Sequence, residues 1–377
     1  MAYSTFLVSA TVVLYTWIAY PFLLRLLRLF RRHTIRPSGQ NYSPFVTIIV
    51  PVHNEQQRIA VKLGDCLELL YPQDRLEIIV ASDASTDGTE EIVRRFVVRD
   101  SRIHWLQSGN RVGKSGVQNL AAAQAQGDIL FFTDANTSMT PGVLRTMIDN
   151  LSDPAIGMVS ATVHFGHPQD AVEKGQGFYW SYELFLRAAE SDLGILATGS
   201  GQAIAVRREL FRPLPACYGD DCIIPLDVRL QGYRVIQDRN ATVFDAMPHS
   251  IQGELRTRIR MTARNWTGTL ARPEILNPLR FPLTALGLIS HKLLRWLTPF
   301  FLAVVFLSNA WLALGGRAVV LWWLQVAFYV SAFVGWELTR KQRRAWVFGY
   351  PFSFCLANIG FFLGMVKAFR NQKIVAY

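Results

Sequence analysis

The sequence predicts a mixed α/β domain of the Rossmann-like kind joined to membrane-spanning helices, and two observations lead to this fold class. From Ser43 to about Leu270, short runs rich in β-branched residues alternate with segments of helical periodicity, which indicates a parallel sheet covered by helices. Other parts of the chain carry long runs without charged residues, each close to the length that crosses about 30 Å of hydrocarbon.

The composition agrees with a membrane component. Hydrophobic residues make up 50% of the 377 residues, more than a water-soluble α/β enzyme usually carries. The net charge of +11 is compatible with nucleic acid, but the basic residues gather beside hydrophobic stretches, so we expect a membrane surface and no nucleic acid. The four cysteines lack paired metal-ligand spacing and are expected to be reduced thiols, with a bridge or a zinc site at Cys217 and Cys222 as the alternative.

Residues 1–24 are predicted to be an N-terminal transmembrane anchor, because no charged residue occurs between Ala2 and Leu24. Five arginines follow within residues 25–42, the predicted basic juxtamembrane linker. Basic residues after an apolar run, without a small-residue cleavage site, favour an uncleaved anchor whose carboxyl side faces the cytoplasm. The α/β domain, residues 43–270, is therefore expected to be cytoplasmic, and the predominance of arginine over lysine points to a bacterial inner membrane.

The C-terminal part is predicted to contain three kinds of segment. Residues 271–295 mix apolar side chains with Lys292 and Arg295, as in an amphipathic segment that lies in the membrane interface. Residues 296–366 predict three transmembrane helices, and residues 367–377 form a basic tail. Three crossings put this tail outside, against the positive-inside tendency, so one re-entrant segment is the alternative. The three predicted helices are residues 296–314, 318–336 and 345–366.

Polar side chains follow the first predicted strand of the α/β domain. The apolar run 46–50 is expected to break at Pro51 and to bring Asn54 and Glu55 to the carboxyl end of the strand. Ligands of open α/β sheets bind at that edge. The alternative is an ordinary strand-to-helix turn in which Asn54 is the N-cap.

Two further predicted strands also end in carboxylates. The run 77–81 leads to Asp83, whose oxygens can accept hydrogen bonds from a base or a ribose. The run 128–133 leads to Asp134, with Asn136 two residues later on the same face of an extended segment. Two such oxygen-bearing side chains can hold a divalent cation against a diphosphate.

Together with a Gly-Lys-Ser turn at residues 113–115, these elements resemble the family 2 glycosyltransferases of the GT-A fold. Their order and spacing both match, from about Val46 through the terminal membrane helices. The terminal membrane helices resemble those of the membrane-integrated branch of the family, which contains cellulose, chitin and hyaluronan synthases and ceramide glucosyltransferases. The matching elements are Pro51 with Asn54 and Glu55, then residues 82–89, 113–115 and 133–137.

The resemblance implies a nucleotide diphosphate sugar donor, of the UDP type, and a divalent cation, Mg²⁺ or Mn²⁺. It implies that Asp83 contacts the nucleoside, that Lys114 lies near the nucleotide, and that Asp134 and Asn136 form the metal and diphosphate motif. Asn136 departs from the family pattern, because an amide replaces the usual carboxylate and removes one charge. The other residues expected at the donor site are Pro51, Asn54 and Glu55.

The Asp-Asp pair after Tyr218 resembles the acidic pair of the same family. The resemblance implies that Asp221 is the general base that deprotonates the acceptor, giving inversion, and that Asp220 positions it. An N-capping role for the pair is the alternative. The family's Gln-x-x-Arg-Trp element is degenerate here, but Arg260 and Arg264 are expected to hold diphosphate, with lipid headgroups as their alternative partner.

The leading functional hypothesis is an inverting hexosyltransferase that moves a sugar to a lipid or glycan acceptor at the membrane. The alternative is a processive polysaccharide synthase coupled to secretion, which the degenerate arginine element and the few membrane helices make the second choice. A third hypothesis is an inactive scaffold or glycan-binding subunit. The presence of Asp83, Asp134 and Asp221 argues against it, since a clefted charge costs stability unless a ligand uses it.

Overall fold

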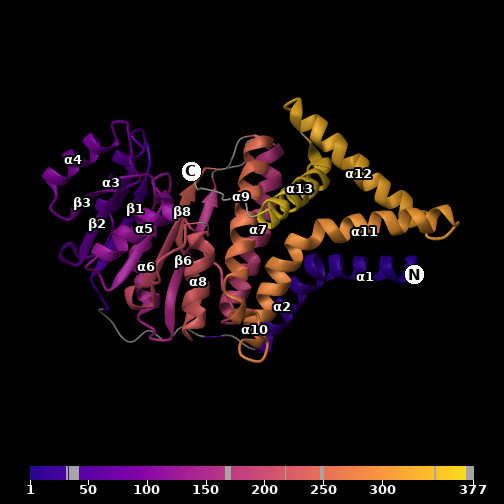
Figure 1. Cartoon of the computed structure of the whole chain (residues 1–377), viewed down its shortest axis with the longest axis horizontal. Coiled ribbons are helices and arrows are strands. Elements are labelled where there is room, and N and C mark those ends of the chain that lie inside the picture. The colour runs from indigo at the N-terminus through magenta and orange to yellow at the C-terminus, as the bar shows by residue number, and fades with distance from the viewer. Residues whose placement is uncertain are drawn as a thin grey trace.

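The structure is a computed structural model that describes residues 1–30, 33, 42–165, 171–216, 218–246, 250–343 and 345–370. Figure 1 places the α/β domain on one side and the long apolar helices on the other, with α7 and α9 between them. Of the predicted linker and tail, residues 31–32, 34–41 and 371–377 lie outside the described residues, as does Cys217. The other three cysteines are free thiols.

One eight-stranded sheet forms the centre of the α/β domain, in the order β3-β2-β1-β4-β7-β6-β8-β5. Strands β3, β2, β1 and β4 are parallel, whereas β7 runs antiparallel to both β4 and β6. The first half is therefore Rossmann-like and the second half is mixed. The strands are β1 (Val46–Val52), β2 (Leu76–Ser82), β3 (Ile103–Gln107), β4 (Ile129–Thr133), β5 (Ser138–Met139), β6 (Ile156–Phe165), β7 (Ala203–Arg207) and β8 (Arg234–Asp245).

Helices cover both faces of this sheet, as a parallel sheet requires. Strand β1 is buried along its whole length, and its side chains alternate between two cores: Ile48 packs on one face and Ile49 on the other. The helices are α3 (Ile59–Leu67), α4 (Thr89–Arg99), α5 (Gly113–Gln124), α6 (Val143–Leu151), α7 (Ala171–Asp192), α8 (Asp220–Leu230) and α9 (Ile251–Leu270). Short helical turns occupy Gln73–Arg75, Arg208–Leu210, Pro273–Leu276 and Trp346–Phe348.

Pro51 does not break the first strand, so that prediction was wrong. Strand β1 continues to Val52, and Pro51 pairs with Ala81 of β2. The ladder between β1 and β4 ends at Ile49. A residue without an N–H is tolerated beyond that point because this side of the strand has no partner there.

Four helices in the described residues are long and apolar enough to cross a membrane, as predicted. The first joins α1 (Ala2–Leu14) to α2 (Tyr20–Phe30) through a π-helical turn, and the second joins α10 (Pro282–Gly287) to α11 (Leu294–Leu314) through another. Each is one continuous helix, so no structural break marks the predicted boundary at residue 295. The others are α12 (Val319–Arg340) and α13 (Gly349–Phe369), and the π-helical turns are Tyr15–Ala19 and Leu288–Leu293.

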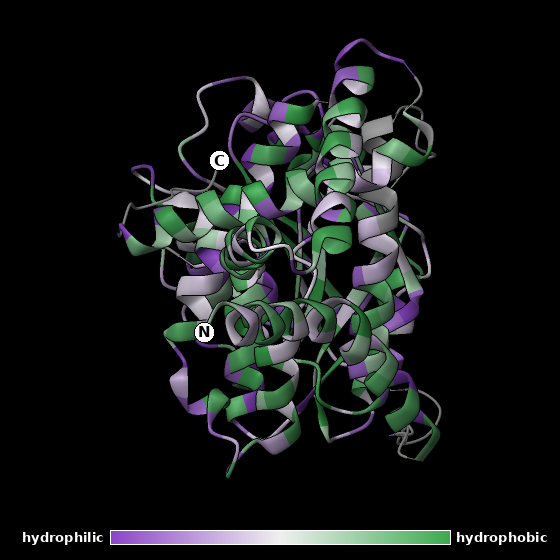
Figure 2. Cartoon of the chain, turned by 90° about the vertical axis from the view of Figure 1, so that its right-hand side faces the viewer, coloured by the Kyte–Doolittle hydropathy of each residue, from purple (hydrophilic) through white to green (hydrophobic). Residues whose placement is uncertain are grey.

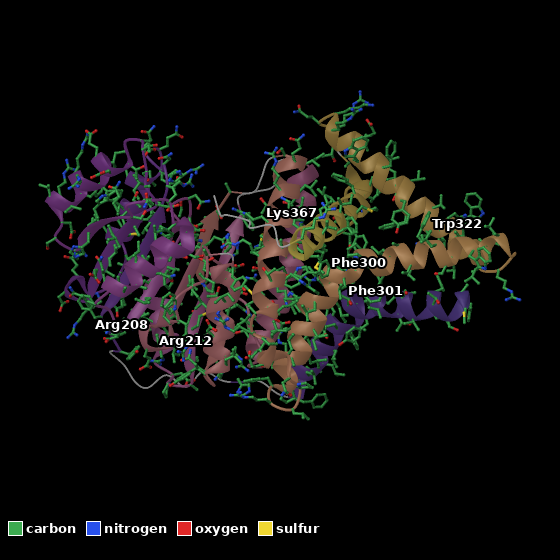
Figure 3. All side chains as sticks on the ribbon, in the orientation of Figure 1. Arg208, Arg212, Phe300, Phe301, Trp322 and Lys367 are labelled. Carbon is green, nitrogen blue, oxygen red and sulfur yellow. The ribbon has the colours of Figure 1, made fainter. Side chains whose placement is uncertain are left out.

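The colouring by hydropathy agrees with this division, because hydrophobic residues run along the helices that face the viewer in Figure 2. Figure 3 labels Phe300, Phe301 and Trp322 on these helices, and Arg208 with Arg212 on the α/β domain, away from them. Some basic residues therefore lie far from the apolar helices.

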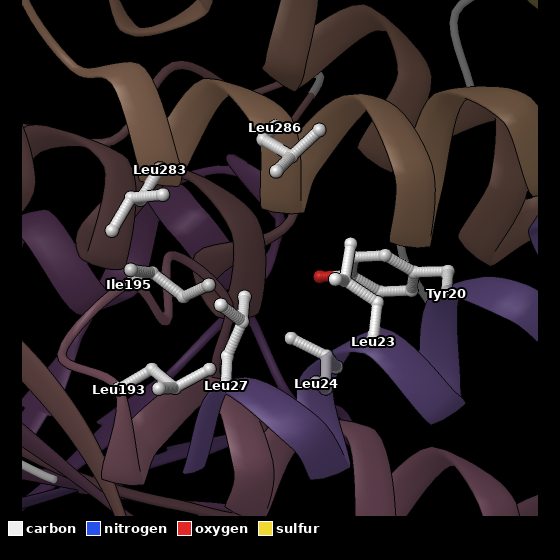
Figure 4. A pocket seen from close by; sticks show the side chains of 8 residues that line it. All are labelled: Tyr20, Leu23, Leu24, Leu27, Leu193, Ile195, Leu283 and Leu286. Carbon is white, nitrogen blue, oxygen red and sulfur yellow. The ribbon is translucent and has the colours of Figure 1, made fainter. Parts of the chain in front are cut away.

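The α/β domain and the apolar helices are joined by packed contacts. Helix α9 packs along α13, and α2 packs against α7. Between α2, α10 and the chain after α7 lies an apolar cavity of about 30 Å³, lined mainly by leucines together with Tyr20 and Ile195 (Figure 4). Apolar side chains around this cavity are one part of the contact between the α/β domain and the helices.

Candidate active site

Lys114 lies at the centre of the candidate site and joins two predicted acidic residues. Its Nζ is 2.6 Å from Asp134 Oδ1 and 2.9 Å from Asp220 Oδ2. The lysine comes from the start of α5, Asp134 follows β4, and Asp220 begins α8. The site therefore lies at the carboxyl edge of the parallel strands, where ligands of such sheets bind.

Asp220 is buried and held in its ionised form. Besides Lys114, Gln118 Nε2 donates to Asp220 Oδ2 at 2.9 Å. Burial by itself raises the pKa of this carboxyl, but the charge of Lys114 and the bond from Gln118 outweigh it and lower the pKa to about 2. Gln118 was missed in the sequence because it carries no charge and lies within a helix.

Asp221 has the opposite electrostatic environment. Burial and the neighbouring Asp220 raise the pKa of its carboxyl. The charges of Arg264, Arg187 and Lys114 lower the pKa by less, so the net shift is upward. A raised pKa makes a carboxylate a better proton acceptor. The N-capping alternative for the pair is wrong, because Gly219 is the N-cap of α8.

Gly219 allows the Asp221 carboxylate to lie close to the backbone. A Cβ on this glycine would stand 2.3 Å from Asp221 Oδ1 and 2.9 Å from Asn265 Oδ1 of α9. The carboxylate is therefore confined between the start of α8 and helix α9.

Asp83 binds the loop that leads into α5. Its side chain is fully buried, and Oδ1 accepts hydrogen bonds from the backbone N–H groups of Val112 (2.6 Å) and Gly113 (3.1 Å). Its second oxygen makes no hydrogen bond in the described part of the chain and lies 3.7 Å from Arg111 Nε. Through this loop, Asp83 also fixes the start of the helix that carries Lys114.

Asn54 and Glu55 join the loops after β1 and β2. Asn54 has a left-handed backbone (φ 57°), and its Oδ1 accepts from the Thr86 N–H at 2.8 Å. The Glu55 N–H donates to Thr89 Oγ1 at 2.9 Å. The N-cap of α3 is Arg58, so the N-capping alternative for Asn54 is wrong.

Only one of the two predicted arginines reaches the acidic pair. Arg264 is 8% exposed, donates to the Tyr218 carbonyl, and lowers the pKa of both Asp220 and Asp221. Arg260 is exposed on α9. The candidate site thus includes Arg264 but not Arg260.

Asn136, the amide in the predicted metal motif, contacts a carboxylate from another strand. Its Nδ2 donates to Asp245 Oδ1 at 3.1 Å, at the end of β8, and Gln202 Nε2 donates to Asp245 Oδ2 at 3.1 Å. No group of three His, Cys, Asp or Glu residues in the described ranges is arranged to hold a metal. The oxygens of Asp134, Asn136 and Asp245 are nevertheless of the chemical type that Mg²⁺ and Mn²⁺ prefer, so these residues fit such a cation.

Lys62 is a further residue that the sequence analysis missed. It is 1% exposed, and its Nζ donates to Thr133 Oγ1 (2.7 Å) and to the Thr137 carbonyl (2.8 Å). Burial lowers the pKa of this amine. The lysine thereby joins both ends of the turn that carries Asp134 and Asn136. A charged residue within the apolar stripe of α3 is the signal that could have found it.

Comparison with known proteins matches this domain to one family. The model described as Glycosyl transferase family 2 matches residues 47–214. A glycosyltransferase of Haloferax volcanii is 30% identical over 125 residues, which is 33% of this chain and 41% of that protein. An N-acetylglucosaminyltransferase of Bradyrhizobium diazoefficiens is 25% identical over 305 residues, 74% of this chain and 60% of that protein. The chain therefore spans less than two thirds of the length of these relatives.

A solved structure shares the fold over almost the whole chain. It is a mannosyltransferase from Pyrobaculum calidifontis, in complex with GDP-Man and Mn²⁺. The two structures agree with a TM-score of 0.75 over 99% of this chain and 100% of that one, at 24% sequence identity. The predicted GT-A fold is confirmed.

Proposed function

Because the chain contains a family 2 glycosyltransferase domain, we propose that it is an inverting transferase that moves a sugar from a nucleotide diphosphate sugar to an acceptor at the membrane. The observation that carries this proposal is the position of Lys114 between Asp134 and Asp220, with Asp221 adjacent. Lys114 and Asp134 are partly exposed, at 16% and 28% of their side chains, so a ligand can exchange with their mutual ion pair.

In the proposed reaction, the acceptor oxygen forms a bond to the anomeric carbon while the bond from that carbon to the diphosphate breaks. Asp221 takes the proton of the acceptor hydroxyl. The nucleoside diphosphate leaves with the bonding electrons, and Lys114 and Arg264 offer positive charge to it. A divalent cation held by Asp134, Asn136 and Asp245 would supply further neutralisation of the diphosphate.

The donor is proposed to be a UDP-sugar, as the sequence resemblance implies. Other donors should be tested as well, because similar proteins include N-acetylglucosaminyltransferases and a mannosyltransferase solved with GDP-Man. UDP-glucose, UDP-N-acetylglucosamine and GDP-mannose are therefore the donors to compare.

The acceptor is proposed to be a lipid or a glycan at the cytoplasmic face of a bacterial inner membrane. The four candidate spanning helices support the membrane location, and Arg25 and Arg28 after the first apolar run support the orientation. Residues 271–295 are proposed to lie in the interface, and residues 296–366 to supply the three remaining spans.

The test uses the full chain in detergent or nanodiscs, with each donor, Mn²⁺ or Mg²⁺, and a membrane lipid extract as acceptor. We expect lipid-stimulated release of nucleoside diphosphate that Asp221→Asn abolishes while donor binding persists. Asp149→Asn, which changes an exposed aspartate of α6 paired with Arg145, is the matched control and should keep wild-type turnover. Turnover by Asp221→Asn at the wild-type rate would exclude Asp221 as the base, and absence of binding of every donor would overturn the proposed function.

A further inference from the structure

A buried cluster of charges joins α7 to the second candidate spanning helix. Its centre is Glu183, which is 3% exposed and lies within hydrogen-bond distance of four basic side chains. Such a cluster is costly to desolvate unless every charge is paired. The four basic groups are Arg187 Nε (3.0 Å), His291 Nε2 (3.0 Å), Lys292 Nζ (2.5 Å) and Arg295 Nη1 (2.6 Å).

Arg187 extends this cluster toward the acidic pair. Its second contact is from Nη1 to Ser200 Oγ at 2.7 Å, and the arginine is 4% exposed. The Ser200 N–H in turn donates to Ser160 Oγ of β6 at 2.8 Å. The guanidinium therefore holds Ser200 with one edge while it binds Glu183 with the other, a fork geometry that lysine does not have.

The residues on either side of Ser200 lie against the acidic pair. The Gly199 N–H donates to the Asp221 carbonyl at 2.8 Å. A Cβ on Gly201 would stand 3.4 Å from Asp220 Oδ1. The segment Gly199–Gly201 therefore packs against both Asp220 and Asp221.

We propose that Arg187 is a positioning residue for the transfer reaction, which ties the segment Gly199–Gly201, and through it the base Asp221, to the spanning helix that carries Arg295. This inference rests on the proposed function, because it takes Asp221 as the base. It predicts that the base keeps its place only while the contact between α7 and the spanning helix is intact.

The charge of Arg187 provides a readout that a merely structural role would not move. The charged groups that act on Asp221 are Asp220, which raises the pKa of its carboxyl, and three cations that lower it. Removal of one cation raises that pKa, so the base becomes protonated at a higher pH and the acid limb of the kcat profile shifts upward. The three cations are Arg264, Arg187 and Lys114.

The experiment compares Arg187→Met, Arg187→Lys, Ser200→Ala and the double variant Arg187→Met/Ser200→Ala in the full chain in nanodiscs. For Arg187→Met we expect kcat to fall roughly tenfold to a hundredfold, with unchanged donor KM and an acid limb at higher pH. Arg187→Lys should keep the wild-type limb with a smaller loss of kcat. Ser200→Ala should lower kcat without moving the limb, and the double variant should lose little more than Arg187→Met, because both changes remove one contact.

A control variant separates positioning from general destabilisation. Arg207→Met removes hydrogen bonds to the carbonyls of Leu151 and Ile156 at the opposite end of β7, and should lower Tm without changing the pH profile. Wild-type kcat and pH profile in folded Arg187→Met, or additive losses in the double variant, would overturn the inference. If Asp221→Asn itself retains turnover, the proposed function fails instead, so the two failures are distinguishable.

Discussion

Two clusters of opposite charges in this molecule differ in their access to solvent. In the candidate site, Lys114 bridges Asp134 and Asp220, and the Asp134 side chain is 28% exposed. At the junction with the spanning helices, the side chains of Glu183 and Arg295 are only 4% and 2% exposed. A charge pair that solvent reaches can exchange its partner for a ligand, whereas a sealed one cannot without unfolding its surroundings. The first cluster, called the open cluster below, is therefore suited to binding. The second, called the sealed cluster, is suited to holding the domain in place.

The largest expected effect concerns the sealed cluster. Glu183→Gln removes the buried counter-charge that Arg187, Lys292 and Arg295 share, which should cost about 3–5 kcal/mol of unfolding free energy. Denaturant or thermal unfolding in detergent measures this loss. Glu91→Gln, which changes an exposed helix pair with Arg95, is the control and should leave stability within error. Equal effects of the two variants would remove the distinction between sealed and open clusters.

The open cluster should respond in activity more than in stability. Lys114→Met removes a positive group proposed to face the leaving diphosphate, so kcat should fall about a hundredfold to a thousandfold. Unfolding of the same variant should change less than that of Glu183→Gln, because Asp134 keeps access to water and the buried Asp220 keeps the hydrogen bond from Gln118 and the nearby charge of Arg264. Steady-state kinetics and unfolding curves of both variants test the contrast, which an unchanged kcat in Lys114→Met would contradict.

Gly219→Ala tests whether the position of the Asp221 carboxylate matters for the reaction. The added methyl would stand 2.3 Å from Asp221 Oδ1, so the carboxylate has to turn away. We expect kcat to fall roughly tenfold to a hundredfold with donor KM unchanged. Gly64→Ala in α3, where a Cβ meets nothing within 4 Å, should keep wild-type kcat. A loss of donor affinity in Gly219→Ala would instead assign this region to the nucleotide.

The smallest effect is expected at Lys62, which is sealed yet bonded to the turn of the open cluster. Lys62→Met should weaken Mn²⁺ binding about tenfold, because the turn that carries Asp134 and Asn136 loses the group that joins its two ends. Titration of the Mn²⁺ electron paramagnetic resonance signal measures this directly. Wild-type Mn²⁺ affinity in a folded variant would mean that the turn keeps its shape without the lysine.

The parallel half of the sheet could be predicted from sequence because each strand and its polar residues are neighbours along the chain. The predicted runs 46–50, 77–81 and 128–133 correspond to β1, β2 and β4, with ends shifted by up to two residues. The count of four apolar helices followed from the same kind of local pattern, and the GT-A fold from the resemblance of the motifs to a known family.

Many contacts of the site and of the junction with the spanning helices join residues far apart in sequence, and no local pattern predicts them. Gln118 and Asp220 are 102 residues apart, and Glu183 and Arg295 are 112 residues apart. The continuation of β1 through Pro51 was missed for a related reason, since it depends on where the ladder to β4 ends. Such contacts exist only once the chain is folded.

The two π-helical turns limit how the spanning helices can be altered. They meet in space, where Tyr15 Oη and Ser290 Oγ are 2.8 Å apart. A π-helical turn accommodates one extra residue without turning the rest of the helix, so a regular α-helix built from the same number of residues would rotate everything beyond that point by about 100°. The face that carries His291 and Lys292 toward Glu183 would then no longer align with the rest of its helix. A regular α-helix of the same length is consequently not a neutral replacement for either segment in a chimaera.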